Sequence, residues 1–283
     1  MDNNTPLVSI VLPMYNAEKF VGECIQSILS QAYTNFELLV LDDGSTDGSI
    51  KVVESFSDSR IRLIRRKHDY ISTLNCGLSE SQGKYIARMD ADDIMSPLRI
   101  EKQVAIMEYD RNITICASYS KVLGDDTIIE SPIKGHIINF QAMLLLGNIM
   151  SHSSVMIRKD FLFKNNLSYS QNYPYAEDYK LWADIAGRGG TLFVIPLPLV
   201  TYRISNTQAT HSHHEEQVNT TVLIKNEVLI DLIDKSKSKS ELSKLLEQLL
   251  HFNNKELISD TTIFSLFYDL FSNVALYTKD HIR

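Results

Sequence analysis

Three aspartates stand within four residues in the stretch "YIARMDADDIMSP", where Asp90, Asp92 and Asp93 directly follow an apolar run. Crowded carboxylates repel one another, so a positive partner is expected beside them. Two carboxylates two residues apart suit a hard divalent cation such as Mg²⁺ or Mn²⁺, which prefers oxygen ligands. A solvated acidic turn is the alternative, because Asp-x-Asp pairs are frequent in loops. The position after an apolar segment favours the metal site.

A second acidic pair, Asp42 and Asp43, follows the earlier apolar stretch "FELLVL". The chain has neither a GxxxxGK[ST] loop nor a GxGxxG loop after its first apolar run. A bound phosphate would therefore be neutralised by a metal ion, not by a glycine-rich backbone loop. This pattern disfavours P-loop NTPases and nicotinamide-dependent dehydrogenases.

The first hundred residues alternate between two hydrophobic periodicities. Short apolar, β-branched runs predict strands, and apolar residues at helical spacing predict helices. Strands are expected over 7–13, 36–43, 61–66 and 84–90, and helices over 18–31, 45–56 and 72–83. Ser96 and Pro97 are expected as the N-cap and first residue of the next helix. This order predicts an α/β fold with a mainly parallel sheet flanked by helices.

Three polar segments should meet at one edge of this sheet. Residues 13–16, 42–45 and 90–93 each come directly after a predicted strand. Ligands of such sheets bind beyond the carboxyl ends of the strands. We therefore expect one site built from these three segments.

The rest of the chain gives a weaker pattern. Strands are expected over 113–123 and 191–204, a hairpin arm over 125–131, helices over 139–148 and 176–190, and a strand plus turn over 153–162. Two prolines interrupt "TLFVIPLPLVTYRI", which favours a sheet edge for that strand. From about residue 215 the pattern is helical. We expect a catalytic domain over 1–214, divided into a nucleotide half (about 1–110) and an acceptor half (about 111–214), and a helical extension over 215–283.

Composition excludes some classes of protein. The 283 residues are 44% hydrophobic, which suits a packed core, and the net charge of −7 argues against a nucleic-acid-binding protein. Cys24, Cys76 and Cys116 are scattered and odd in number, as expected for buried thiols in a reducing compartment. No signal peptide is apparent, and no run approaches about 18 apolar residues. A cytoplasmic protein is expected, with peripheral membrane association as an addition.

The chain resembles a known family in three ordered motifs. "VSIVLPMYNAEKFVGECIQSILSQAYTNFELLVLDDGSTDGS" is similar to the opening of glycosyltransferase family 2, the inverting enzymes of GT-A fold. "GKYIARMDADDIMSP" resembles the metal-binding segment of that family, and "AEDYKLW" resembles the segment with its catalytic base. The resemblance covers roughly Val8 to Arg203.

The resemblance implies roles on the donor side. Pro13 and Tyr15 would line the nucleobase pocket, with Tyr15 stacking on uracil. Asp43, with Asp42 beside it, would hydrogen-bond the base or the ribose. Asn75 belongs to the same nucleotide-sugar-binding set.

Further roles follow for the diphosphate and the acceptor. Asp90 and Asp92 would hold the ribose and a Mn²⁺ or Mg²⁺ ion, with Asp92 as the direct ligand. Asp178 would be the general base that deprotonates the acceptor hydroxyl, and the alternative for it is a helix cap. Glu177 and Trp182 are expected on the acceptor side.

Two departures from the family pattern concern the donor pocket. "KHDYIS" replaces the usual Asn-x-x-Gly turn after the third strand, so His68 is expected to change the shape of the base pocket. Ser205 stands where the family often has a histidine. His211 or His213 is a candidate further metal ligand, and a solvated polar loop is the alternative. Arg203 would contact the diphosphate or make a structural ion pair.

These features together predict a metal-dependent inverting glycosyltransferase. It would move a hexose or N-acetylhexosamine from a UDP-sugar to a hydroxyl of a glycan or lipid-linked acceptor, forming a β-linkage in surface polysaccharide. The main alternative is a catalytically inactive nucleotide-sugar-binding or scaffold protein on the same fold. A nucleotidyltransferase is disfavoured, because "PMYNAEKF" carries Lys19 as its one basic residue. Whether the last helices pack in the core or as a dimer, or bind a membrane, is left open.

Overall fold

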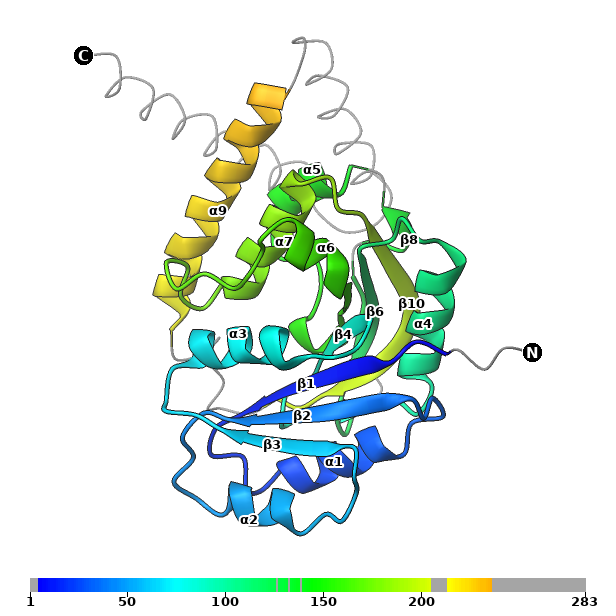
Figure 1. Cartoon of the computed structure of the whole chain (residues 1–283). Coiled ribbons are helices and arrows are strands. Elements are labelled where there is room, and N and C mark those ends of the chain that lie inside the picture. The colour runs from blue at the N-terminus through cyan, green and yellow to red at the C-terminus, as the bar shows by residue number, and fades with distance from the viewer. Residues whose placement is uncertain (1–4, 126, 132, 138, 205–212, 236–283) are drawn as a thin grey trace.

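The computed structural model describes residues 5–125, 127–131, 133–137, 139–204 and 213–235 (Figure 1). Ser205, His211 and the last predicted helices, beyond residue 235, lie outside the described residues. The side chain of His214 also lies outside them.

The described residues form one mixed ten-stranded sheet with the order β3-β2-β1-β4-β9-β6-β10-β5, to which β7 and β8 add at β6 and β10. The strands are β1 (Val8–Met14), β2 (Phe36–Asp42), β3 (Ile61–Arg65), β4 (Tyr85–Arg88), β5 (Ile94–Met95), β6 (Ile115–Val122), β7 (Ile128–Ile129), β8 (Gly135–Ile137), β9 (Met156–Arg158) and β10 (Leu192–Tyr202). β1 to β4 are parallel, and β9 runs antiparallel between β4 and β6. The predicted α/β class with a mainly parallel sheet is confirmed.

Helices cover both faces of the sheet. They are α1 (Val21–Leu29), α2 (Ser49–Glu54), α3 (Tyr70–Glu80), α4 (Arg99–Tyr109), α5 (Phe140–Met143), α6 (Lys159–Lys164), α7 (Glu177–Gly187) and α9 (His214–Lys235), with short 3-10 turns η1 (Leu144–Leu146) and η2 (His152–Ser154). Figure 1 shows α3 on one side of β1 and β2, and α1 with α2 on the other.

Side chains of β1 and β2 alternate between two hydrophobic cores, as the period of two in a strand requires. Ile10 and Leu38 pack with α1, whereas Val11 and Leu39 pack on the side of α3. The second core continues through α7 and η1 to α9, which contributes buried Ile224. Of the three unpaired cysteines, Cys24 and Cys116 are buried, and Cys76 is partly exposed.

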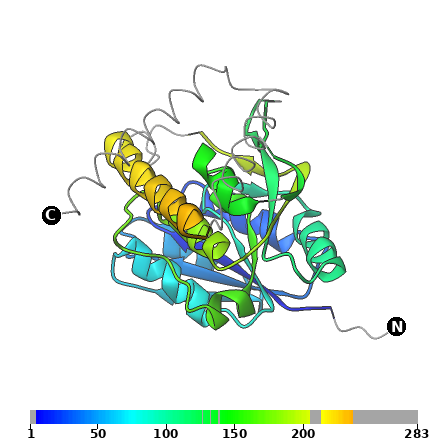
Figure 2. The same ribbon diagram turned by 90° about the horizontal axis from the view of Figure 1, so that it is seen from above.

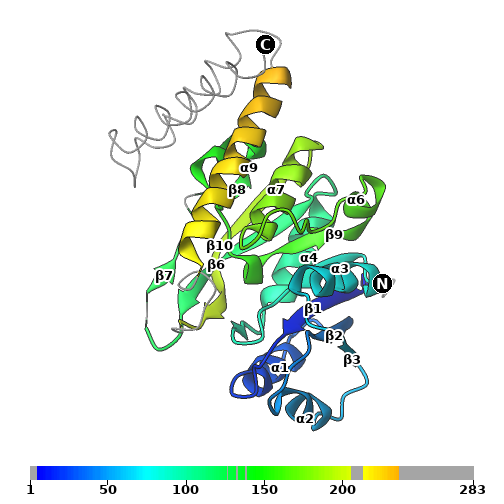
Figure 3. The same cartoon turned by 90° about the vertical axis from the view of Figure 1, so that its left-hand side faces the viewer.

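Helix α9 packs against α7, α5 and η1 (Figure 2). Figure 3 shows β1 to β3 with α1 and α2 at one end of the molecule and α9 toward the other. None of the helices in the described part of the chain has the length and hydrophobicity needed to cross a membrane.

Three local predictions are wrong. The helix expected to start at Ser96 and Pro97 begins at Arg99, with Leu98 as its N-cap; the Ser96 carbonyl instead accepts the Arg99 N–H at 3.0 Å, in the turn before α4. Strand β10 lies between β6 and β5, not at an edge, because register shifts around Pro198 accommodate the prolines. The turn expected after β9 is the short helix α6.

Gly77 allows α3 to approach the sheet closely. A Cβ atom at this position would lie 2.5 Å from Cγ1 of Val11 and 2.7 Å from Cδ1 of Leu41, and both of these side chains are buried. We expect Gly77→Ala to lower the free energy of unfolding by about 1–3 kcal/mol through overpacking, despite the better helix propensity of alanine. Urea denaturation would measure the change. Ser79→Ala, an exposed position of the same helix, is the control; a Gly77→Ala protein as stable as this control would contradict the close packing.

Candidate active site

The site lies beyond the carboxyl ends of β1, β2 and β4, which are parallel neighbours. The loops after β1 and β2 are joined by hydrogen bonds: the Asn16 N–H donates to the Ser45 hydroxyl at 3.0 Å, and the Thr46 N–H donates to the Asn16 side chain at 2.8 Å. Asn16 adopts a left-handed backbone with φ 49° to make this contact. The predicted convergence of the three polar segments is confirmed.

Asp43 is held in the interior at the end of β2. One oxygen accepts hydrogen bonds from the Asp69 N–H at 2.9 Å and from the Thr73 hydroxyl at 2.6 Å. The other oxygen lies 2.9 Å from Nδ1 of His68. Asp43 therefore fixes the loop after β3 to the end of β2.

His68 also covers one face of the Tyr15 ring, which is predicted to stack on the nucleobase. Its ring is stacked on Tyr15, with centroids 4.3 Å apart and planes 25° from parallel. Tyr15 is 48% exposed, so part of its ring remains open to a ligand. The "KHDYIS" departure thus places an imidazole at the predicted base pocket.

Three other predicted donor-side residues have structural contacts. Pro13 is buried within β1, opposite Leu41. The Asp42 side chain accepts from the Ser45 N–H at 3.2 Å, within the loop after β2. Asn75 donates to the Tyr169 carbonyl and accepts from its N–H, each at 2.9 Å, so its amide links α3 to a distant loop.

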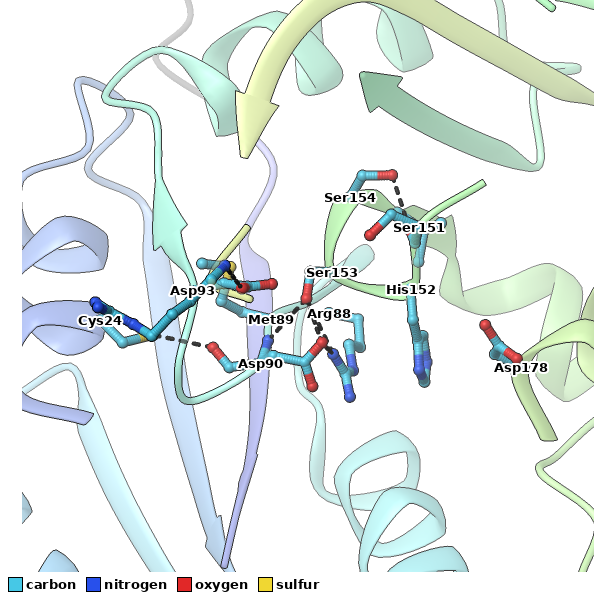
Figure 4. A network of polar contacts seen from close by, with 12 residues as sticks. Cys24, Arg88, Met89, Asp90, Asp93, Ser151, His152, Ser153, Ser154 and Asp178 are labelled. Carbon is cyan, nitrogen blue, oxygen red and sulfur yellow. Dashed lines mark hydrogen bonds and ion pairs between the residues drawn. The ribbon is translucent and has the colours of Figure 1, made fainter. Parts of the chain in front are cut away.

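Asp90 has a positive partner, Arg88, from the end of the preceding strand β4 (Figure 4). Oδ2 of Asp90 forms an ion pair with Arg88 and accepts a hydrogen bond from the Ser153 hydroxyl. Arg88 also donates to Ser153 at 3.2 Å and to the Tyr70 hydroxyl at 2.9 Å. Burial would raise the pKa of Asp90, but the neighbouring guanidinium of Arg88 holds it below its usual value.

Asp92 differs from Asp90 in that it makes no ion pair with a described residue. Burial and the charge of Asp90 raise the pKa of Asp92. Within the described residues, no three His, Cys, Asp or Glu side chains come together as a metal-binding cluster. Two carboxylates nonetheless fit a Mg²⁺ or Mn²⁺ ion that takes its other ligands from water and substrate phosphates.

Asp93 and Arg203 connect the acidic segment to the end of β10. Asp93 is buried and accepts the Arg203 N–H at 3.0 Å, while burial and the charge of Asp90 raise its pKa to about 7. The Arg203 guanidinium donates to the Asp92 carbonyl at 2.9 Å and to Glu23 at 2.6 Å. It also lies over the Phe20 ring, 4.8 Å from its centroid. The structural ion pair considered for Arg203 is thus present.

Asp178 is the second residue of α7, where the helix dipole favours a negative charge. It is not the N-cap residue, which is Ala176. Its carboxylate accepts from the Asn148 side-chain amide at 2.7 Å and from the Tyr179 N–H at 2.6 Å. Burial raises its pKa, and these two hydrogen bonds oppose the effect in part. A carboxylate with a raised pKa is suited to accept a proton.

His152 lies between Asp90 and Asp178 in Figure 4. Its Nε2 is 2.8 Å from the Tyr169 hydroxyl, and its ring meets Trp182 edge-on at 5.9 Å. Burial lowers the pKa of His152 well below its usual value, so the imidazole is neutral. His152 therefore adds no positive charge between Asp90 and Asp178.

Trp182 is fully buried, and its predicted contact with an acceptor stays a prediction. Its ring contacts the ring of His152 edge-on. Glu177 is 9% exposed and adjoins Asp178. The His213 ring stacks on Tyr175 at 4.1 Å and lies 3.5 Å from Glu216, and it belongs to no metal cluster of the described residues.

A cavity of about 370 Å³ opens beside Asp178. The start of α7, the loop at Asn148 and one face of α9 line it. Sequence reasoning missed several side chains around the site: Arg88, Asn148, His152, Ser153 and Lys225. Arg88 alone had a visible signal, since it is a charged residue inside an apolar strand next to the acidic cluster.

Comparisons with known proteins agree with this arrangement. A family model described as glycosyl transferase family 2 matches residues 9–163. An uncharacterized glycosyltransferase of Haemophilus influenzae is 35% identical over 292 residues, which cover 97% of this chain and 88% of that protein. The Escherichia coli UDP-Glc:alpha-D-GlcNAc-diphosphoundecaprenol beta-1,3-glucosyltransferase WfgD is 33% identical over 181 residues, covering 63% of this chain and 69% of its own.

Solved structures share the fold at low sequence identity. S. aureus TarS 1–349 in complex with UDP-GlcNAc has a TM-score of 0.70 at 17% identity, covering 92% of this chain and 75% of its own. The mannosyltransferase PcManGT of Pyrobaculum calidifontis, in complex with GDP-Man and Mn²⁺, has a TM-score of 0.64 at 15% identity, covering 97% and 76%. These likenesses establish the GT-A architecture.

Glu177 gives the site a testable pH dependence. Burial and the charge of Asp178 raise its pKa from 4.5 to about 7, so the folded chain holds this proton more tightly than the unfolded chain. The stability from this group is complete below about pH 4.5 and is lost as the pH rises through 7. We expect Glu177→Gln to match the wild type in acid and to melt several degrees higher at about pH 8. Melting curves across this range would test it.

The exposed Glu130 supplies the control for that experiment. Glu130→Gln should keep the pH dependence of the wild type. Parallel melting-temperature profiles for the wild type and Glu177→Gln would contradict the buried, proton-binding state of Glu177.

Proposed function

Because this chain belongs to glycosyl transferase family 2, we propose that it transfers a hexose or N-acetylhexosamine from a UDP-sugar to an acceptor hydroxyl, with inversion and formation of a β-glycosidic bond. The proposal covers residues 1–214 as the catalytic domain, with a nucleotide half to about residue 110 and an acceptor half after it. Residues 215–283 would form an extension, of which α9 is the described part.

The observation that carries this proposal is the position of Asp178. Its carboxylate lies on the wall of a cavity, is fixed by Asn148, and has a pKa raised by burial. The negative charge of Asp90 contributes to that raised pKa, so the two carboxylates lie within electrostatic range. Inversion requires one base on the acceptor side, opposite a leaving group on the donor side.

In the proposed reaction, Asp178 takes the proton of the acceptor hydroxyl as its oxygen attacks the anomeric carbon. The bond from that carbon to the UDP oxygen breaks, and UDP leaves with its electron pair. Asn148 orients the Asp178 carboxylate by a hydrogen bond from its side-chain amide. Proton transfer to a positioned base contributes about 10²–10⁴-fold to such rates.

On the donor side, the open face of Tyr15 supports stacking on uracil, with His68 and Asp43 forming the edge of the pocket. Asp92, with the second oxygen of Asp90, would hold Mg²⁺ or Mn²⁺. That ion would stabilise the negative charge of the leaving diphosphate. Arg88 neutralises Asp90 from within the protein and fixes one of its carboxylate oxygens.

The acceptor of the related protein WfgD is a lipid-linked saccharide, according to its name. We extend this to the present chain as a glycan or lipid-linked acceptor in surface-polysaccharide synthesis, met at the cytoplasmic face of a membrane. A homodimer through the C-terminal helices remains part of the proposal; residues 236–283 lie outside the described structure. The alternative, an inactive binding protein on this fold, is disfavoured by the complete set of Asp90, Asp92 and Asp178.

The role of Asp178 is tested by Asp178→Asn, which keeps the size and hydrogen-bonding reach of the side chain but cannot accept a proton. We expect turnover to fall about 10²-fold or more, with UDP-sugar binding nearly unchanged. The assay is release of UDP from a panel of UDP-sugars, with water or a lipid-diphosphate-linked N-acetylhexosamine as acceptor. Asp184→Asn, on the same helix and paired with Lys180, should retain turnover. Normal turnover by folded Asp178→Asn protein would show that Asp178 is not the general base.

The metal role of Asp92 is tested by calorimetry of UDP binding with Mn²⁺ and with EDTA. The wild type should bind UDP at least about tenfold more weakly in EDTA, because diphosphate charge then lacks its cation. Asp92→Ala should bind weakly under both conditions, while the exposed-loop variant Asp125→Ala should behave as the wild type. If each protein binds UDP with the same affinity in Mn²⁺ and in EDTA, metal dependence is refuted.

A further inference from the structure

The cavity beside Asp178 has a second charged side chain. Among the described residues that line it, Asp178 and Lys225 carry charge, and the others are polar or apolar. Lys225 comes from α9, more than forty residues along the chain from Asp178. The cavity therefore combines a candidate base from α7 with an ammonium group from a different element.

Packing of α9 fixes the position of Lys225. Ile224 and Val228, on either side of it, are buried in the core that α9 shares with α7 and η1. The Lys225 ammonium lies 4.0 Å from where a Cβ atom on Gly147 would be. The next residue, Asn148, donates the hydrogen bond that holds Asp178. Asp178 and the Lys225 ammonium thus adjoin neighbouring residues, Asn148 and Gly147, of the loop after η1.

Lys225 makes no ion pair with a carboxylate of the described chain. By contrast, Lys180 pairs with Asp184 and Glu227, and Lys235 of the same helix pairs with Asp231. Burial lowers the pKa of Lys225. A partly desolvated ammonium without a counter-ion costs free energy, which a bound anion would offset.

The remaining wall suits a sugar. Val218 and Val222 present exposed apolar side chains from α9, and Thr221 adds a hydroxyl between them. Tyr175 is held in a left-handed backbone with φ 60°, where Gln217 donates to its carbonyl at 2.8 Å. A non-glycine residue in this conformation is strained, so α9 maintains a geometry that the loop alone would not favour.

We propose that this cavity binds the acceptor and that Lys225 recognises an anionic group on it, a phosphate or a carboxylate. That the bound molecule is the acceptor rests on the proposed function. Binding of an anion by Lys225 does not depend on it. The chain has a net charge of −7 and three aspartates on the donor side. An anionic acceptor would be repelled by that charge without a cation beside the base, and Lys225 supplies one.

The test is direct binding, with Mg²⁺ and saturating UDP present to fill the donor side. The probes are N-acetylglucosamine 1-phosphate, methyl glucuronide and the neutral methyl N-acetylglucosaminide, titrated by calorimetry or saturation-transfer NMR. Wild-type protein should bind an anionic probe at least about tenfold more tightly than the neutral one. Lys225→Met should lose this preference, and Lys225→Arg should keep most of it. The comparison of phosphate with glucuronide distinguishes the two sources of charge.

Lys235→Met is the matched control, since it removes a lysine from the same helix outside this cavity. It should retain the wild-type preference. The proposal is overturned if wild-type protein does not prefer an anionic probe, or if Lys225→Met binds it as tightly as the wild type. Titration of the same samples with UDP tests the donor site. Failure to bind UDP would count against the proposed function, and the anion preferences of wild type and Lys225→Met could still be compared.

Discussion

The ion pair between Arg88 and Asp90 is the interaction on which the site depends. Three aspartates at the end of a buried strand would repel one another, and the buried guanidinium of Arg88 offsets this repulsion from within the protein. Arg88 is buried, so a substitution of Asp90 would leave its guanidinium without its carboxylate partner, which is unfavourable. Arg88 therefore allows Asp90 to stay ionised while Asp92 remains available to another cation.

The same ion pair is joined to the segment that precedes β9. Ser153, in η2, hydrogen-bonds to both Arg88 and Asp90, and η2 also carries His152 toward Trp182 in α7. Strand β9 follows η2 directly and pairs antiparallel with β4, which fixes the η2 loop beside the acidic segment. Helix α7 then presents Asp178 to the cavity that α9 closes. The short segment formed by η2 and β9 thus contacts Asp90 and, through His152, the Trp182 side chain of the helix that carries Asp178.

Several features were determined by the sequence itself. Hydrophobic periodicity predicted β1 to β4 and the helices between them, because a buried parallel strand and an amphipathic helix each require a fixed spacing of apolar residues. The parallel order then implied that Tyr15, Asp43 and Asp90 lie at one edge. The three ordered motifs were enough to indicate the family. Local spacing was less reliable at Ser96 and Pro198, where tertiary contacts set the helix start and the place of β10 in the sheet.

Only the tertiary structure decided which charges meet. The contacts of the Arg203 guanidinium with Glu23 and with the Asp92 carbonyl could not be inferred from sequence spacing. The full burial of Trp182, which the packing of α7 produces, could not be inferred from its motif. The side-chain partner of Asp178, Asn148, is 30 residues away, and Gly147 beside Lys225 belongs to the same distant segment, so no local pattern encodes these contacts. Sequence spacing fixes which residues share an element, whereas burial and electrostatic partnership depend on how separate elements pack.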